Sequence, residues 1–432
     1  MQRRTGLLAT AAALLMGMAP MAHAQEPLTL RFSWWGGAAR HEATLKAIAA
    51  FEAKNPNVKI KAEYMGFNGY LERLSTQIAG GYEPDIMQIN WAWLSTFSKT
   101  GEGFYDLHKS KAGLDLAQFS EADLKTGLVQ GKLNALPVSY TARVMLWNRA
   151  ALERSGVNMP TTWDDLYAAG PVLKQKQGDK AYVIDGELYD MILLSQTYIM
   201  QKYGTPYVHP TQPKVAMSPA AALEWVQTYK KLVSNNVAVP LPVRASLGGA
   251  EKPTEQQQDW VVGNWAGNYT WDSVIGLRNS TLNKEQKLDV GEFLTLPNAK
   301  NSGMFGRPAL MFAVSKKSKN PEVAAKFMNF LLTSSEAASI LGLTRGVPSA
   351  DAQFRALTRT DLLQGTELKA YLQIKKLKDA GKIDLPSPLF ENARFNKFMR
   401  EVFETVAYGK ISEQEAATRL VEDGNKLLLR IK

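Results

Sequence analysis

The chain contains no cysteine, which excludes disulfide bonds and cysteine-ligated zinc sites. Histidine is scarce, and the three that follow the N-terminal segment, His41, His108 and His209, lack the H-x-x-x-H spacing of a metal-binding pair. The sequence also contains no G-x-S-x-G nucleophile elbow, no Walker phosphate loop and no dinucleotide-binding glycine pattern. These absences remove the best-marked enzyme classes, and we expect neither a cofactor nor a metal.

The first 24 residues have the three-part build of a secretory signal peptide. Arg3 and Arg4 form a basic start, an apolar run covers 7–18, and Ala22-His23-Ala24 resembles a cleavage site of small residues. The apolar run is too short to span a bilayer, and a chain without cysteine cannot carry a lipid on that residue. We therefore expect cleavage after Ala24 and export to the periplasm. The arginine pair leaves both the general and the twin-arginine routes open.

Basic residues outnumber acidic residues by 51 to 41. The charges are interspersed, whereas a nucleic-acid-binding domain concentrates basic residues on one face. Together with export, this distribution predicts that the protein has no nucleic-acid partner. The basic balance fits either an ordinary solvated surface or an attraction for an anionic solute, and net charge does not decide between them.

Apolar periodicity predicts that strands and helices alternate in the first part of the exported chain. Strands are expected at 28–33, 58–64 and 84–90, and helices over 45–54 and 71–79. This order is typical of an α/β fold with a parallel sheet covered by helices on both faces, where ligands bind beyond the carboxyl ends of the strands. The exported chain is long for one hydrophobic core, which favours two compact lobes.

Tryptophan is plentiful, with ten in the chain, and several fall in three clusters beside Gly, Asn or Ser. A flat ring covers the apolar face of a sugar while neighbouring polar groups bind its hydroxyls. For any one tryptophan a place in the core is an equal alternative, but the three clusters together favour a binding site. Because Trp34 and Trp35 alternate along a strand, only one of them should face a ligand. The cluster residues expected to bind ligand are Trp35, Asn90, Trp91, Trp93, Trp265, Asn268 and Trp271.

Arginines near predicted strand ends and at a helix start form a second group of candidates. A guanidinium group binds a carboxylate through two parallel hydrogen bonds, which would suit an acidic sugar. The alternative for each arginine is an ion pair within the protein. The candidates are Arg40, Arg143, Arg307 and Arg345.

Several segments together resemble the extracellular solute-binding proteins of carbohydrate importers of the ATP-binding-cassette class, family 1. The segments that carry this resemblance include Arg31-Phe32-Ser33-Trp34-Trp35-Gly36-Gly37, Pro84-Asp85-Ile86-Met87-Gln88 and Arg345-Gly346-Val347-Pro348. Within that family the chain is most similar to the oligogalacturonide-binding proteins. It departs from their pattern at Phe67, where relatives often have Trp, and at Arg307, where Lys is expected.

The resemblance implies a two-lobed Venus-flytrap with discontinuous lobes and a ligand cleft at the hinge. The expected N-terminal lobe comprises 25–140 plus 309–345, the C-terminal lobe comprises 141–308 plus 346–432, and crossings lie near 137–143, 304–311 and 345–349. It also implies a monomer that captures an oligosaccharide, with uronate units if the arginines grip carboxylates, and delivers it to a membrane permease.

Three other functions stay open at this point. One is a neutral oligosaccharide or polyol binder of the same importer class. Another is a periplasmic carbohydrate-active enzyme, because paired carboxylates such as Asp164 and Asp165 are present, although a chain with 41 acidic residues supplies such pairs by composition alone. The last is a protein-binding module, which would expose an apolar patch in place of a cleft with Trp and Arg.

Overall fold

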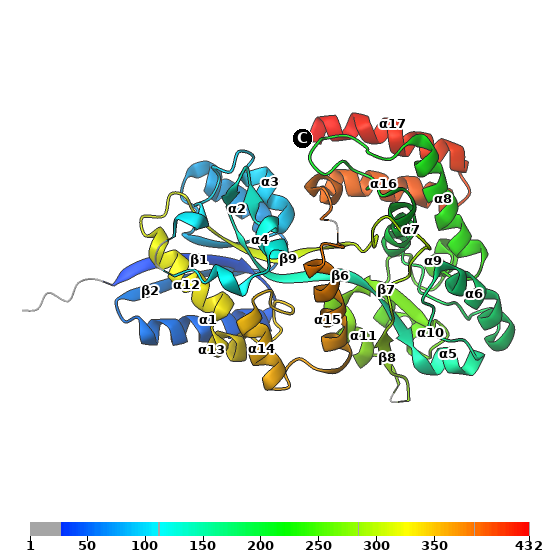
Figure 1. Ribbon diagram of the computed structural model, residues 1–432, viewed down its shortest axis with the longest axis horizontal. Coiled ribbons are helices and arrows are strands. Elements are labelled where there is room, and N and C mark those ends of the chain that lie inside the picture. The colour runs from blue at the N-terminus through cyan, green and yellow to red at the C-terminus, as the bar shows by residue number, and fades with distance from the viewer. Residues whose placement is uncertain (1–26, 111–112, 284, 384, 432) are drawn as a thin grey trace, which may run out of the picture.

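The computed structural model describes residues 27–110, 113–283, 285–383 and 385–431. The expected signal peptide and its cleavage site after Ala24 lie outside the described residues. Figure 1 shows two lobes side by side, with long strands running from one to the other. Within the described ranges, no helix has the length and apolar character needed to cross a membrane.

The first lobe is built on three parallel strands. Strand β1 (Leu28–Trp35) lies between β2 (Val58–Met65) and β3 (Ile86–Ile89) and pairs with both in parallel. Helix α1 (Ala38–Lys54) joins β1 to β2, and α2 (Tyr70–Gly80) joins β2 to β3. These five elements confirm the strands and helices predicted from apolar periodicity, and they direct the carboxyl ends of the three strands to one edge of the sheet.

The predicted parallel sheet is confirmed for these three strands, whereas the later strands, whose direction was not predicted, join the sheet antiparallel. Strand β9 (Gly306–Val314) is antiparallel to both β3 and β6 (Leu136–Asn148). Strands β7 (Gly267–Trp271) and β8 (Leu288–Val290) are antiparallel to β6. Strand β6 has 13 residues. Its first half pairs with β9, and its second half pairs with β7 and β8. Only the strands that alternate with helices near the start of the chain are parallel.

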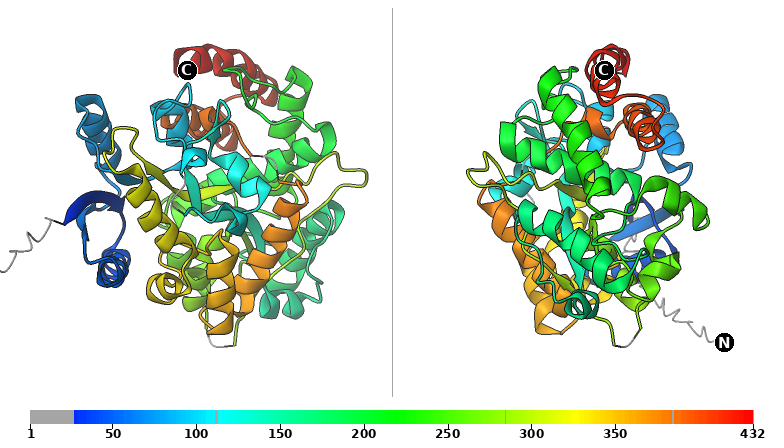
Figure 2. Two further views of the ribbon diagram at one scale, coloured as in Figure 1. Left: turned by 60° about the vertical axis from the view of Figure 1, so that its left-hand side comes forward. Right: turned by 90° about the vertical axis from the view of Figure 1, so that its right-hand side faces the viewer.

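Buried apolar side chains form two large clusters, one in each lobe. The chain leaves the first cluster after Val138 and returns to it at Leu310, so β6 and β9 both connect the two cores. The helices that cover the first core are α1, α12 (Pro321–Thr333) and α13 (Ser335–Leu341), and those of the second include α6 (Trp163–Gln177), α7 (Leu188–Tyr203), α8 (Pro219–Ser234), α16 (Ala393–Ala407) and α17 (Glu413–Ile431). Figure 2 shows α17 in red at the edge of the second lobe in both views.

The residue bounds predicted for the two lobes stay predictions. Helix α14 (Asp351–Arg359) packs against α12 and α13, although the expected boundary at 345 assigns it to the second lobe. The segment at 345–349 lies against β6, where Ser349 donates its backbone N–H to the Val138 carbonyl at 3.1 Å. It therefore runs beside the two crossing strands.

Three further helices begin with local sequence signals. Helix α6 begins with a capping box, in which Thr162 accepts from the Asp165 backbone and the Asp165 side chain accepts from the Thr162 backbone. Helices α8 and α12 each begin with proline in the first turn. The remaining elements are α3 (Leu94–Phe97), α4 (Glu121–Thr126), β4 (Leu128–Val129), β5 (Lys132–Leu133), α5 (Arg149–Ser155), α9 (Leu241–Ser246), α10 (Gln258–Val261), α11 (Ile275–Ser280), α15 (Gly365–Asp379) and six 3₁₀ turns, η1 (Trp91–Trp93), η2 (Leu107–Lys109), η3 (Leu116–Gln118), η4 (Thr254–Gln256), η5 (Asp272–Val274) and η6 (Pro388–Glu391).

Candidate functional site

Four aromatic side chains form what we call the aromatic shelf: Trp35, Phe67, Tyr70 and Trp93. The ring of Trp35 lies 5.0 Å from that of Tyr70, 5.2 Å from that of Trp93 and 5.7 Å from that of Phe67, centre to centre. The rings of Phe67 and Trp93 are inclined by only 17°. Phe67 is 56% exposed, whereas Trp35 is 7% exposed. The shelf therefore has a buried base and an outer ring open to solvent.

The prediction that Trp34 and Trp35 face opposite sides of the strand is confirmed. Trp34 packs against Phe32 and Tyr64 and donates its indole N–H to His41 at 3.1 Å. Trp35 alone of the two belongs to the shelf. This follows from the two-residue period of a strand.

The shelf lies where the two lobes meet. Trp35 is the last residue of β1, and Trp93 belongs to η1, which follows β3. Asn90 starts this turn, because its side chain accepts from the Ala92 backbone at 3.0 Å. Turn η1 contacts η6 of the second lobe. The carboxyl ends of the parallel strands thus present aromatic rings towards the junction of the lobes, which is the usual ligand edge of such a sheet.

Trp271 of the second lobe lies beside two arginines. The guanidinium carbon of Arg143 is 4.5 Å from the centre of its ring, and that of Arg307 is 4.9 Å away. Arg143 forms an ion pair with Asp190, and Arg307 forms one with Glu391. Arg143 is only 2% exposed. Burial alone would lower the pKa of Arg143, but the Asp190 carboxylate raises it above the usual value. Both cations are already offset by a carboxylate of the protein.

Arg40 and Arg345 lie on the other side of the junction and have a different environment. Arg40 donates to the carbonyls of Trp35 at 3.0 Å and Thr344 at 2.9 Å. Arg345 donates at 3.0 Å to Gln88, whose amide donates to the same Trp35 carbonyl at 3.1 Å. Burial, with a further contribution from the charge of Arg40, lowers the pKa of Arg345 to about 9. Among the described residues neither arginine forms an ion pair.

Three other predicted residues lie in the lobe cores. Trp91 is 4% exposed, Trp265 is 1% exposed and Asn268 is fully buried. The Arg244 guanidinium lies 5.8 Å from the Trp265 ring centre, and Asn268 accepts from Arg278 at 3.3 Å. The structure brings Trp35 close to Trp93, and Trp271 close to Arg143 and Arg307. Trp91, Trp265 and Asn268 lie in the cores, and their contact with a ligand stays a prediction.

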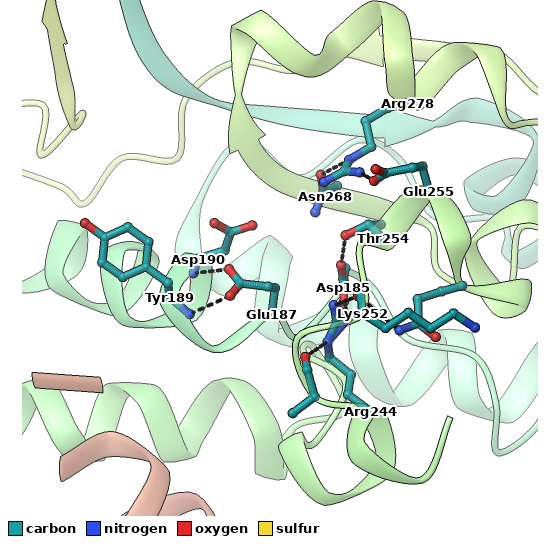
Figure 3. Close-up of polar contacts among 12 residues, drawn as sticks. Asp185, Glu187, Tyr189, Asp190, Arg244, Lys252, Thr254, Glu255, Asn268 and Arg278 are labelled. Atoms are coloured by element: carbon teal, nitrogen blue, oxygen red, sulfur yellow. Dashed lines mark hydrogen bonds and ion pairs between the residues drawn. The ribbon is translucent and has the colours of Figure 1, made fainter. Parts of the chain in front are cut away.

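Two sets of polar contacts lie near the start of α7 in the second lobe (Figure 3). Arg244 pairs with Asp185 at 3.0 Å, and both side chains are fully buried. Thr254 donates its hydroxyl to the same carboxylate. Glu187 accepts from the backbone at the start of α7, including Asp190 at 3.0 Å. Asp185 precedes α7 (Leu188–Tyr203), so its contacts hold the segments of Arg244 and Thr254 close to the start of that helix.

Phe67, Tyr70 and Glu391 were not among the predicted site residues. The first two lie in Gly66-Phe67-Asn68-Gly69-Tyr70, which has the same association of aromatic residues with Gly and Asn as the three tryptophan clusters and would have identified them. Glu391 has no comparable signal, because only the fold places it beside Arg307, 84 residues away in the sequence.

The second lobe also contains a mainly apolar cavity of about 360 Å³. Phe305 lines it, and the ring of Phe305 lies 5.7 Å from that of Trp271. Phe305 thus both lines the cavity and packs against Trp271. Within the described residues, no group of three or more acidic or histidine side chains is arranged to hold a metal ion.

Comparison with solved structures gives close matches over almost the whole chain. A periplasmic oligogalacturonide binding protein from Yersinia enterocolitica is 39% identical, with a TM-score of 0.84, and the match covers 93% of this chain and 99% of that one. The same protein in complex with saturated digalacturonic acid matches with a TM-score of 0.80. A de novo designed cysteine esterase is 38% identical, with a TM-score of 0.88, over 94% of this chain and 99% of that one. The present chain has no cysteine.

Curated sequences give a shorter match. A binding protein from Brucella abortus is 28% identical over 199 residues, which are 44% of this chain and 46% of that protein. The chain thus matches about half the length of these relatives. The family model of the bacterial extracellular solute-binding proteins matches residues 37–338, a range that includes most of the shelf, Trp271 and Arg307. The chain belongs to the bacterial extracellular solute-binding protein family.

Proposed function

We propose that this protein captures an oligosaccharide with uronate units in the periplasm and delivers it to an importer of the ATP-binding-cassette class. The observation that carries the proposal is the aromatic shelf at the junction of the lobes. Its outer ring, Phe67, is more than half exposed, and Trp93 lies almost parallel to it. Such a surface matches the apolar face of a sugar ring.

Two observations support uronate as the sugar class. Arginines lie on both sides of the lobe junction, Arg40 and Arg345 in the first lobe and Arg307 beside Trp271. The similar Yersinia protein was solved in complex with digalacturonic acid. Guanidinium groups bind carboxylates more strongly than they bind neutral hydroxyls.

The mode of action follows from the connections between the lobes. Strands β6 and β9 pass from one core to the other, and bending within these strands would close the lobes over a sugar. The closed form would then engage the permease. We expect a monomer that is exported with cleavage after Ala24 and does not transform its ligand.

A neutral oligosaccharide or polyol is the second candidate ligand. The observation that favours it is that Arg143 and Arg307 already pair with carboxylates of the protein. A paired guanidinium still donates to sugar hydroxyls but attracts a second carboxylate less strongly.

Calorimetry on the exported chain with digalacturonate, maltose and a free polyol tests the proposal. We expect tight binding of digalacturonate. Tight binding of maltose or the polyol without binding of digalacturonate would establish the second candidate. In the same preparation, new reducing ends or unsaturated products after incubation with sugars would show that the protein is an enzyme.

A further inference from the structure

Of the four arginines predicted to bind ligand, only two lack a carboxylate partner. Arg143 and Arg307 are paired, as described above, whereas Arg40 and Arg345 form no ion pair within the described part of the chain. A guanidinium group that is removed from water and not offset by an anion is costly.

Arg40 belongs to the first turn of α1, which has an unusual N-terminus. The first turn contains no acidic residue, and no side chain caps it. Most helices carry Ser, Thr, Asp or Asn at this position, or acidic residues that complement the positive end of the helix dipole. Gly37, Ala38 and Ala39 are exposed, and a Cβ atom added at Gly37 would meet nothing within 4 Å. The free N–H groups of this turn thus face open space.

Arg345 supplies a second, independent observation. Its side chain is buried, with the residue 6% exposed, and its Nη2 atom has no hydrogen-bond partner. Arg345 donates to Gln88, which donates to the Trp35 carbonyl, and Arg40 donates to the same carbonyl. The Trp35 carbonyl thus joins the two arginines.

This carbonyl is also at the edge of the aromatic shelf. The ring of Trp35 forms the base of the shelf, and the carbonyl of the same residue accepts from Arg40. Only Gly36 and Gly37 separate Trp35 from the start of α1. A sugar ring over the shelf would therefore have its substituents close to the positive end of the helix.

We propose that the N-terminus of α1, together with Arg40 and Arg345, is the subsite that binds the carboxylate of an acidic sugar unit lying on the aromatic shelf. The subsite rests on the proposed function and narrows it, because it names the two arginines that distinguish a uronate from the corresponding neutral sugar. Arg40 and the helix N–H groups contact the carboxylate. Arg345, which is joined to Arg40 through Gln88 and the Trp35 carbonyl, adds its charge.

The test compares digalacturonate with α-1,4-linked galactobiose, which lacks the two carboxylates but keeps the same linkage. Calorimetry is performed on the wild-type chain and on Arg40→Gln, Arg345→Gln and Arg149→Gln. Arg149 is the matched control, because its side chain is 56% exposed on α5 and its replacement removes one positive charge from the second lobe. Thermal unfolding verifies that each variant is folded.

We expect Arg40→Gln to weaken digalacturonate binding by tenfold or more and to change galactobiose binding by less than twofold. Arg345→Gln should act in the same direction, and Arg149→Gln should change neither. If Arg345→Gln does not fold, Arg40→Gln decides alone. An Arg40→Gln variant with the wild-type preference for digalacturonate would overturn the subsite and leave the proposed function intact. Equal binding of both sugars by the wild type would also overturn it, and binding of neither sugar would overturn the proposed function along with it.

Discussion

The guanidinium carbon of Arg307 lies 4.9 Å from the centre of the Trp271 ring. Arg307 is the second residue of the crossing strand β9, and Trp271 ends β7. Glu391 on η6 accepts from Arg307, and η6 also contacts η1 of the first lobe. The charge of this arginine is therefore offset by an element of the second lobe that contacts the first lobe.

This relationship predicts an effect of Glu391→Gln on selectivity. The substitution removes the carboxylate that offsets Arg307 and leaves the guanidinium beside Trp271 with its full charge. Calorimetry should show digalacturonate affinity rising by about fivefold, about 1 kcal/mol, relative to galactobiose. Glu401→Gln, on the exposed face of α16, removes the same charge with a side chain that is 59% exposed and should leave the ratio unchanged. An unaltered ratio in Glu391→Gln would mean that Arg307 does not face the bound sugar.

Trp93→Ala should weaken binding of both the acidic and the neutral sugar. The variant removes a ring that lies 5.2 Å from Trp35 at the base of the shelf and almost parallel to the exposed Phe67. A central aromatic contact of this kind contributes about 2 kcal/mol, which corresponds to about a thirtyfold loss of affinity. Tyr408→Ala removes a ring that is 41% exposed outside the shelf and serves as the control. Equal affinities for Trp93→Ala and the wild type would remove the shelf from the binding site.

The local elements of the first lobe were predictable because their signals are short-range. The alternation in 28–33 and the glycine pair after Ala79 depend only on neighbouring residues, and β1 and α2 follow them. The antiparallel strands were not predictable in this way. The pairing of β6 with β9 joins segments whose contacts, such as Thr141 opposite Arg307, are distant in the sequence.

The same distinction applies to the candidate site. From their tryptophan clusters Trp35 and Trp93 were both expected to bind ligand, and the structure places their rings 5.2 Å apart. The carboxylate partners of Arg143 and Arg307 could not be predicted from the sequence, since they lie 47 and 84 residues away. Whether a guanidinium is offset or free depends on tertiary structure alone.

The stability of the hinge region should depend on pH through Asp272. Burial raises the pKa of Asp272 from 3.8 to about 6, although hydrogen bonds from Thr141 and the Ala142 backbone oppose the rise. The folded state then binds a proton more readily than the unfolded state. Stability from this group is present at low pH and is lost as the pH rises from about 4 through about 6.

Asp272→Asn removes this titration. Urea unfolding at several pH values should show the wild type losing stability relative to Asp272→Asn between pH 4 and pH 6, with a constant difference above pH 7. A difference that stays constant across the whole range would show that the carboxyl group has the same pKa in the folded and unfolded states.

The buried pair of Asp185 and Arg244 predicts strongly non-additive effects on stability. Both side chains are fully buried, so removal of either partner leaves the other charge without compensation. We expect Asp185→Leu and Arg244→Met each to lower the free energy of unfolding by about 3–5 kcal/mol. The double variant should be less destabilised than the sum of the two by about 2 kcal/mol, because no isolated charge remains.

The exposed pair Glu42–Lys46 is the matched control for this cycle, since its side chains are 70% and 66% exposed. Its coupling energy in urea unfolding should be below about 1 kcal/mol. Some destabilisation should persist in the buried double variant, because Arg244 also donates to the Lys252 carbonyl at 2.8 Å and Thr254 donates to Asp185. If the losses of unfolding free energy at Asp185 and Arg244 are additive, the ion pair does not hold the segment around Arg244 against the start of α7. The neighbouring carbonyl and hydroxyl groups would then do so.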